Sequence, residues 1–136
     1  MKQVLRVDMD PVVKQLLGYA ASEHNVDSEC NKYKNSPHRK LFGLEKQGIA
    51  IGCMGVELNR LMECEIKHIA VSPDYRNQGA GRQMVSFLYS WPFIQLITAE
   101  TDRTAVQFYR KLGFTMESLG EKYPGVERFK CTKLLK

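Results

Sequence analysis

The segment that most restricts the fold of this chain is residues 71–82, which read VSPDYRNQGAGR. An apolar, strand-like run ends at Val71, and Ser72-Pro73-Asp74 stops it because proline cannot continue a β-ladder. Basic residues and two glycines follow, and an amphipathic helix then runs to about Trp91-Pro92. We therefore expect a strand, a tight turn and a helix in immediate succession.

The start of such a helix is suited to binding an anion. Its first turn presents N–H groups without intrahelical partners, at the positive end of the helix dipole. Gly79 and Gly81 allow positive φ and close approach of a ligand to the backbone, while Arg76 and Arg82 add positive charge. A pyrophosphate fits this arrangement, although the segment matches neither the P-loop nor the GxGxxG fingerprint. A plain glycine-containing turn with solvated arginines remains the alternative.

Apolar periodicity along the rest of the chain predicts an α+β fold in one domain, residues 1–136. A helix should begin at Asp10-Pro11 and end near His24, and Asp102 should cap another that Gly113 ends. Residues 25–38 have no continuous apolar face, so we expect a loop or a short helix there. The expected strands are residues 2–7, 40–46, 49–58, 63–71, 95–101, 114–119 and 126–135.

The composition excludes the acidic, disordered, collagenous and fibrous classes of protein. The 136 residues are 43% hydrophobic and 26% charged, which is typical of a globular domain. Twenty Lys and Arg against 15 Asp and Glu give a net charge of +5, which favours an anionic ligand.

No apolar run reaches the roughly 20 residues of a membrane span, and the N-terminal charges come too early for a signal peptide, so we expect a cytoplasmic protein without a membrane partner. The cysteines form no CxxC pair, which predicts reduced, buried thiols and no metal site; they are Cys30, Cys53, Cys64 and Cys131.

Two segments resemble the GNAT superfamily of acetyl-CoA-dependent N-acetyltransferases. Residues 71–82 are similar to its acetyl-CoA signature, [Q/R]-x-x-G-x-[G/A] after a strand that ends in V-x-P. Residues 105–114, AVQFYRKLGF, are similar to its second helix, A-x-x-[F/L]-Y-x-x-x-G-F, and the spacing between the two blocks also fits. The resemblance implies a mixed, mostly antiparallel GNAT-type sheet, splayed at its centre between strands 63–71 and 95–101, with helices on both faces.

The resemblance also implies acetyl-CoA as co-substrate and assigns the residues that bind it. The pantetheine arm pairs with the backbone of the strand that ends at Val71, and the pyrophosphate lies on backbone N–H groups from Asn77 through Arg82. Asp102 stands where the family often has an asparagine that contacts the cofactor, and an ionised aspartate can only accept hydrogen bonds. The cofactor-binding residues implied are Ile69, Ala70, Val71, Arg76, Asn77, Gln78, Gly79, Ala80, Gly81, Arg82 and Asp102.

Acetyl transfer to an amine requires two proton transfers. A primary amine with a pKa of about 10.4 must lose a proton, and the departing CoA thiolate must gain one. Tyr109 matches the family's general-acid position, although its apolar stripe equally fits a core tyrosine. Glu65 lies in EIKHIAV, which resembles the strand that carries a base glutamate in some members, and the alternative is a solvated charge. His68 or a water chain is the other candidate base, and regular alternation places His68 on the opposite face from Glu65.

These observations favour an N-acetyltransferase that transfers the acetyl group of acetyl-CoA, by direct attack, to a primary amine of a small molecule or protein. The alternative is a non-catalytic acyl-CoA-binding or regulatory module on the same fold, against which Tyr109 argues. A nucleic-acid partner is disfavoured because most aromatic residues fall on faces predicted to be buried. We expect a monomer or a homodimer, and no motif identifies the acceptor.

Overall fold

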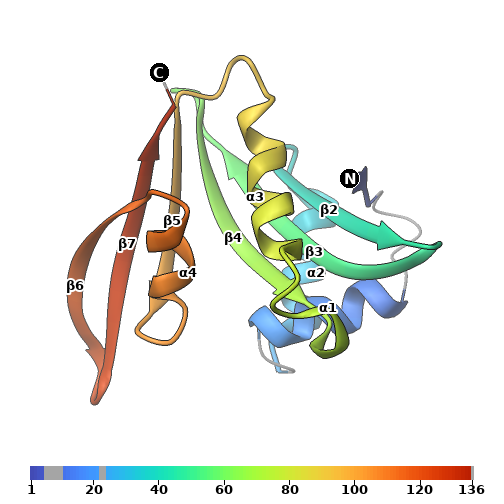
Figure 1. Cartoon of the computed structure of the whole chain (residues 1–136), viewed down its shortest axis with the longest axis horizontal. Helices are drawn as coiled ribbons and strands as arrows, with labels where there is room; N and C mark the ends of the chain where they lie inside the picture. The colour runs from blue at the N-terminus through green and yellow to red at the C-terminus, as the bar shows by residue number, and fades with distance from the viewer. Residues whose placement is uncertain (5–10, 22–23, 136) are drawn as a thin grey trace.

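A single seven-stranded sheet organises the chain in the computed structural model, which describes residues 1–4, 11–21 and 24–135 (Figure 1). The strand order is β1-β2-β3-β4-β5-β7-β6, and every neighbouring pair is antiparallel except β4 and β5. The strands are β1 (Lys2–Gln3), β2 (Arg39–Lys46), β3 (Ile49–Leu58), β4 (Glu63–Val71), β5 (Leu96–Asp102), β6 (Thr115–Tyr123) and β7 (Val126–Leu134). The helices are α1 (Pro11–Ala21), α2 (Val26–Asn35), the 3-10 turn η1 (Pro73–Tyr75), α3 (Ala80–Tyr89) and α4 (Val106–Lys111).

Helices cover both faces of the sheet, as expected, and divide the core in two. One hydrophobic cluster joins α3 and α4 to the sheet through residues such as Met84 and Val106. The other joins α1 and α2 to the opposite face through residues such as Leu17 and Val26. We call these the α3–α4 face and the α1–α2 face. Among the described helices, none is long and apolar enough to cross a membrane.

The sheet is splayed at its centre. β4 and β5 pair only from Glu63 with Leu96 to Ile66 with Ala99, and beyond these residues the two strands diverge (Figure 1). β4 remains paired with β3, and β5 remains paired with β7, over the whole diverging part. The predicted splay between these two strands is therefore confirmed.

A β-bulge interrupts β4 beside the splay. Gly55 of β3 lies opposite His68, whereas the next residue, Val56, lies opposite Ile66. Lys67 is therefore an extra residue without a partner on β3. A bulge bends the strand and shifts the alternation of its side chains.

The bulge changes which residues of β4 share a face. Ile66 and Ile69 both pack into the α3–α4 cluster although they are three positions apart, and Ala70 packs into the other cluster. Glu65 and His68 consequently lie on the same face of the sheet, the α1–α2 face. The sequence-based placement on opposite faces was wrong, because it assumed regular alternation through Lys67.

The second helix was not clearly predicted. Val26, Cys30 and Tyr33 form a buried stripe at positions i, i+4 and i+7, which is enough to attach α2 to the sheet but too narrow to stand out in a polar segment. The predicted cap at Asp10 and the second half of the predicted strand 2–7 lie outside the described residues.

Several other local predictions are confirmed. Gly113 has the positive φ of a residue that ends a helix. The Asp102 carboxylate accepts a hydrogen bond from the Ala105 N–H at 3.1 Å, but α4 begins only at Val106 with Ala105 as its N-cap, so Asp102 stabilises the turn before the helix. All four cysteines are buried and free. β6 is longer than expected and runs to Tyr123.

Gly55 provides a testable contact between α2 and the sheet. A Cβ atom there would overlap the Tyr33 hydroxyl and lie 2.8 Å from its Cε1. Gly55→Ala should therefore lower the free energy of unfolding, measured by urea denaturation, by about 1–3 kcal/mol. If this overlap is the cause, the double variant Gly55→Ala/Tyr33→Ala should lose less free energy of unfolding than the two single variants lose in sum. Strictly additive losses would show that the overlap with Tyr33 is not the cause.

Candidate active site

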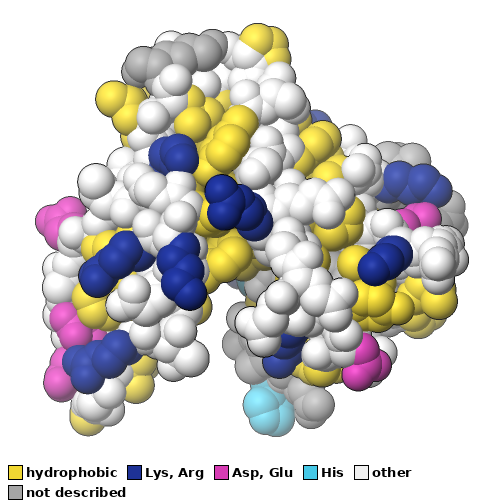
Figure 2. Space-filling view, in the orientation of Figure 1, with side chains coloured by type: hydrophobic (Ala, Val, Ile, Leu, Met, Phe, Trp, Pro, Cys, Tyr) yellow, Lys and Arg dark blue, Asp and Glu magenta, His cyan; other side chains and the backbone are white. Residues whose placement is uncertain are grey.

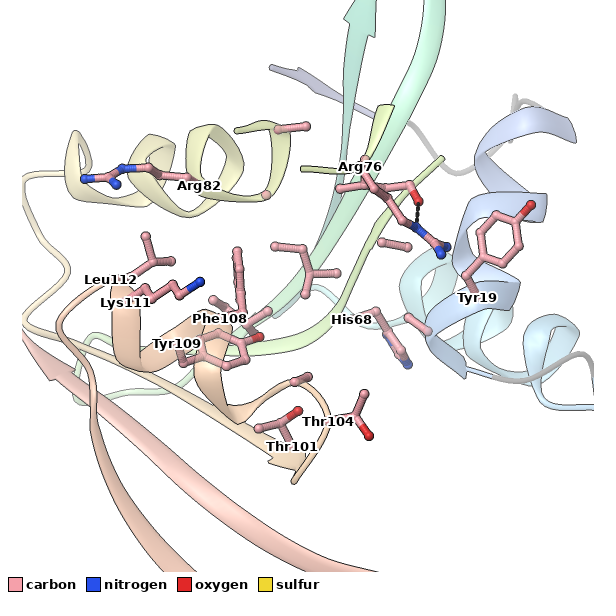
Figure 3. Close-up of a pocket in the computed structure, with 18 of the residues that line it drawn as sticks. Tyr19, His68, Arg76, Arg82, Thr101, Thr104, Phe108, Tyr109, Lys111 and Leu112 are labelled. Atoms are coloured by element: carbon pink, nitrogen blue, oxygen red, sulfur yellow. Dashed lines mark hydrogen bonds between the residues drawn. The ribbon is translucent and has the colours of Figure 1, made fainter. Parts of the chain in front are cut away.

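The splay opens into a cavity of about 830 Å³, within the usual range for small-molecule sites. Residues 66–71 of β4 line one wall and residues 100–102 of β5 line the other. The start of α3 and half of α4 also line the cavity (Figure 3), as do Tyr19 of α1 and Arg128 of β7. In the space-filling view the molecule is hollowed between its two halves, and Lys and Arg side chains lie around the hollow (Figure 2).

The turn before α3 has the conformation that its glycine predicts. Gly79 is the N-cap of α3 with φ +85°, and Asn77 also has positive φ, +62°. In the described part of the chain, a Cβ atom at Gly79 would meet no other atom within 4 Å. Glycine is therefore required here for its backbone conformation, and the space beside it stays open to the cavity.

Gly81 has a different role, because it lets α3 and α4 approach each other. A Cβ atom at Gly81 would lie 2.9 Å from Cε1 of Phe108. The Phe108 ring can therefore lie against the first turn of α3. This contact fixes the distance between the two helices that line the same side of the cavity.

The two arginines of the motif lie in different surroundings. Arg76 donates from Nε to the Val71 carbonyl oxygen at 3.0 Å, and its guanidinium lies 5.4 Å from the centre of the Tyr19 ring (Figure 3). Arg82 is exposed on the first turn of α3. All the predicted cofactor-binding residues line the cavity except Gln78, which donates to the Asp74 carbonyl oxygen at 3.4 Å and lines a separate, smaller hollow.

Tyr109 belongs to both the core and the cavity. Its side chain is 4% exposed and lies between Phe108 and Phe114, with ring centroids 5.0 and 5.3 Å away. It lines the cavity, and its hydroxyl makes no hydrogen bond with any described residue (Figure 3). Burial raises the pKa of Tyr109, so the hydroxyl stays protonated and is available as a donor.

Glu65 lies outside the cavity lining. It stands in the paired part of β4, opposite Glu57 on one side and Thr98 on the other. Its carboxylate lies 3.0 Å from Nζ of Lys67, the bulged residue, which does line the cavity. The following residue, Ile66, also lines the cavity, so Glu65 is close to its edge.

His68 lines the cavity, but both of its ring nitrogens have partners. Nδ1 lies 2.6 Å from the Tyr33 hydroxyl, and Nε2 lies 3.3 Å from Oε1 of Glu29. Burial lowers the pKa of His68, although Glu29 opposes this shift. Because a carboxylate can only accept, we assign the proton of the neutral ring to Nε2, and Tyr33 then donates to Nδ1.

A polar network extends from His68 into the α1–α2 face. Arg39 of β2 lies 3.3 Å from Glu29, donates to Glu57 at 3.1 Å, and lies over the Tyr33 ring. The network joins α2 to three strands. Sequence reasoning missed Glu29 and Tyr33 because they come from a segment without a motif, and only the tertiary fold brings them to His68.

Comparison with known proteins identifies the family. Residues 37–116, more than half of the chain, match the family described as the acetyltransferase (GNAT) domain. The chain belongs to the GNAT acetyltransferase family. Its relatives are also named as enzymes of this kind, and this GNAT chain is therefore an acetyltransferase.

Two relatives and one structure illustrate the similarity of this GNAT enzyme to known proteins. An uncharacterized N-acetyltransferase in the lysA 3' region of Bacillus methanolicus is 28% identical over 102 residues, which cover 72% of this chain and 85% of that protein. The N-alpha-acetyltransferase RimI of Mycobacterium tuberculosis is 29% identical over 99 residues, which cover 68% of this chain and 63% of RimI. The crystal structure of an aminoglycoside 6'-N-acetyltransferase complexed with coenzyme A has the same fold, with a TM-score of 0.78, 16% identity, and coverage of 100% of this chain and 98% of that chain.

The neutral state of His68 predicts how stability depends on pH. Because its pKa is lowered from 6.5, the folded GNAT chain binds fewer protons than the unfolded chain as the pH falls through that value. The free energy of unfolding should therefore decrease between about pH 7.5 and about pH 5, with a contribution from this group of at most about 1.4 kcal/mol per pH unit. Urea denaturation across this range measures the slope.

His68→Gln removes the titrating ring and should flatten this part of the profile. His38 is exposed, so His38→Gln is the matched control and should keep the wild-type slope. A wild-type slope in His68→Gln would contradict the assignment.

Proposed function

We propose that this enzyme transfers the acetyl group of acetyl-CoA to a primary amine of a small molecule or protein by direct attack. The observation that carries the proposal is one cavity with an anion-binding helix start on one side and the Tyr109 hydroxyl on another. The family and its named relatives support acetyl transfer.

The proposed phosphate site is the turn from Asn77 to Arg82. Positive φ at Asn77 and Gly79 turns the chain sharply before α3, and no atom of the described residues fills the space beside Gly79. Phosphate oxygens would accept hydrogen bonds from the free N–H groups of the first turn of α3. The coenzyme A bound in the aminoglycoside acetyltransferase structure supports this ligand class.

The proposed site for the pantetheine arm is the edge of β4 from Ile69 to Val71. β5 pairs with β4 only as far as Ile66, so no described strand covers this edge. The amide groups of the arm can therefore pair with the backbone as an added strand would. The arm would direct the thioester toward the bulge at Lys67 and toward Tyr109, which both line the cavity.

In the proposed reaction, the amine nitrogen attacks the thioester carbonyl carbon. A C–N bond forms, the C–S bond breaks, and the acceptor is released as an N-acetyl amide. Tyr109 donates its phenolic proton to the departing sulfur, and the proton lost by the attacking nitrogen passes through water to a base. The base releases that proton to solvent, and the phenolate of Tyr109 takes up a proton from solvent, which restores the phenol. The raised pKa of Tyr109 keeps this proton in place until the thiolate leaves.

We assign the role of base to Glu65 acting through water. Glu65 lies outside the cavity lining, so a water molecule is needed to connect it to the amine. Its carboxylate lies 3.0 Å from Nζ of Lys67, which lines the cavity, so the ion pair holds Glu65 beside the cavity edge. His68 is closer to the cavity, but Tyr33 and Glu29 occupy both of its ring nitrogens.

Binding of acetyl-CoA tests the phosphate site. Acetyl-CoA should raise the Tm of the wild-type chain, since a ligand at a hundredfold excess over its Kd stabilises the native state by about 2.7 kcal/mol. Gly79→Val should remove most of this shift, because its side chain would block the approach of phosphate to the backbone. Gly125→Val is a matched control: Gly125 has a similar φ of +78° and equally open surroundings, but does not line the cavity. A full shift in Gly79→Val would contradict the assignment.

The rate of thiol release tests whether Tyr109 is the general acid. Tyr109→Phe keeps the ring between its aromatic neighbours and deletes only the hydroxyl, so stability and the Kd for acetyl-CoA should change little. The release of free thiol should fall by about 10²–10⁴-fold with any amine that is acetylated. Tyr89→Phe, an exposed change on α3, should have wild-type turnover. Wild-type turnover in Tyr109→Phe would leave Tyr109 as a core residue only.

A further inference from the structure

The cavity holds an arginine on its far side from the phosphate site. Arg128 of β7 lines the cavity, is half-buried, and makes no hydrogen bond or ion pair with any described residue. The next residue, Phe129, packs into the α3–α4 cluster. Since side chains alternate along a strand, Arg128 lies on the α1–α2 face, away from the helix start proposed to bind phosphate.

The other lining lysines and arginines are engaged or lie on the cofactor side. Lys67 is paired with Glu65, and Arg76 donates to the Val71 carbonyl oxygen. Arg82 and Lys111 belong to α3 and α4. In the part of the chain that the structure describes, Arg128 is therefore the one lining cation of the α1–α2 face that is left for a ligand.

A carboxylate lies next to Arg128 but does not neutralise it. Asp102 and Arg128 are direct cross-strand partners in β5 and β7, and both line the cavity, yet they form no ion pair. One oxygen of Asp102 is held by the Ala105 N–H, which fixes the carboxylate at the start of α4. The site thus presents a positive and a negative group side by side, each with capacity to bind a ligand.

We propose that Arg128 binds a carboxylate of the acceptor, and that the acceptor is an amino acid, whose ammonium group is drawn to Asp102 before it loses its proton. This inference rests on the proposed acetyl transfer to a primary amine. The guanidinium fork matches a carboxylate with two parallel hydrogen bonds. A polyamine would meet like charge at Arg128, and an uncharged amine would leave the half-buried guanidinium without a partner.

Paired acceptors test the proposal. Each amino acid of a panel is compared with the amine that its decarboxylation gives, such as leucine with 3-methylbutylamine and phenylalanine with phenethylamine. The wild-type enzyme should acetylate at least one amino acid with a kcat/KM roughly 10–100-fold above that of its paired amine, the range expected for hydrogen bonds to a charged group. Arg128→Met should remove this advantage by lowering kcat/KM for the amino acid and leaving the paired amine unchanged.

Arg110→Met is the matched control. Arg110 is exposed on α4 and does not line the cavity, so the variant loses the same charge without touching the site and should keep the preference. Arg128→Met should also keep the wild-type increase in Tm with acetyl-CoA. Loss of that increase would assign Arg128 to the cofactor and overturn the proposal.

The remaining outcomes distinguish a failure of acceptor recognition by Arg128 from a failure of acetyl transfer itself. If amines are acetylated without preference for a carboxylate, or if Arg128→Met lowers both members of a pair equally, acceptor recognition by Arg128 is overturned and acetyl transfer stands. If acetyl-CoA binds but neither the amino acids nor their paired amines release thiol, the amino-acid acceptor is overturned. If peptides with a free N-terminal amine and polyamines also release no thiol, the proposed function is overturned as well.

Discussion

The pairing of β4 with β5 stops at Ile66 and Ala99, and the position of every other part of the site depends on that end point. Each strand keeps its antiparallel partner on the outer side, β3 for β4 and β7 for β5, so the two halves diverge without losing their own ladders. Backbone groups at the inner edges are left to pair with a ligand, because buried amides need partners. A splayed sheet thus supplies both a cavity and an extended backbone template.

Glycine at three positions lets the surrounding elements close on this opening. Gly79 turns the chain into α3 with a backbone conformation that other residues rarely adopt, and Gly81 admits Phe108 against the first turn of that helix. On the opposite face, Gly55 leaves room for Tyr33, whose hydroxyl reaches His68 beside the bulge. The α3–α4 face therefore carries the features suited to the cofactor, and the α1–α2 face carries the polar network around His68, which is suited to an acceptor.

The polar network around His68 explains why this histidine is not free to act as a base. His68 is bonded on both nitrogens, and burial disfavours its charged form. Its partner Glu29 also binds Arg39, so the ring is one member of a network that holds α2 against the sheet. A ring that is held in this way shapes the cavity. The Tyr109 hydroxyl and the Arg128 guanidinium have no partner among the described residues and remain available to ligands.

The order of most elements, the turn before α3 and the family could be predicted without a structure, because they depend on local backbone preferences, apolar periodicity and short motifs at fixed spacing. The sequence also pointed to residues that line the cavity, from Ile69 to Tyr109. The bulge at Lys67, and with it the shared face of Glu65 and His68, could not be predicted in this way, because a bulge depends on the register with β3. The network around His68 and the place of Arg128 opposite Asp102 were likewise decided by contacts between segments far apart in sequence, for which no local pattern exists.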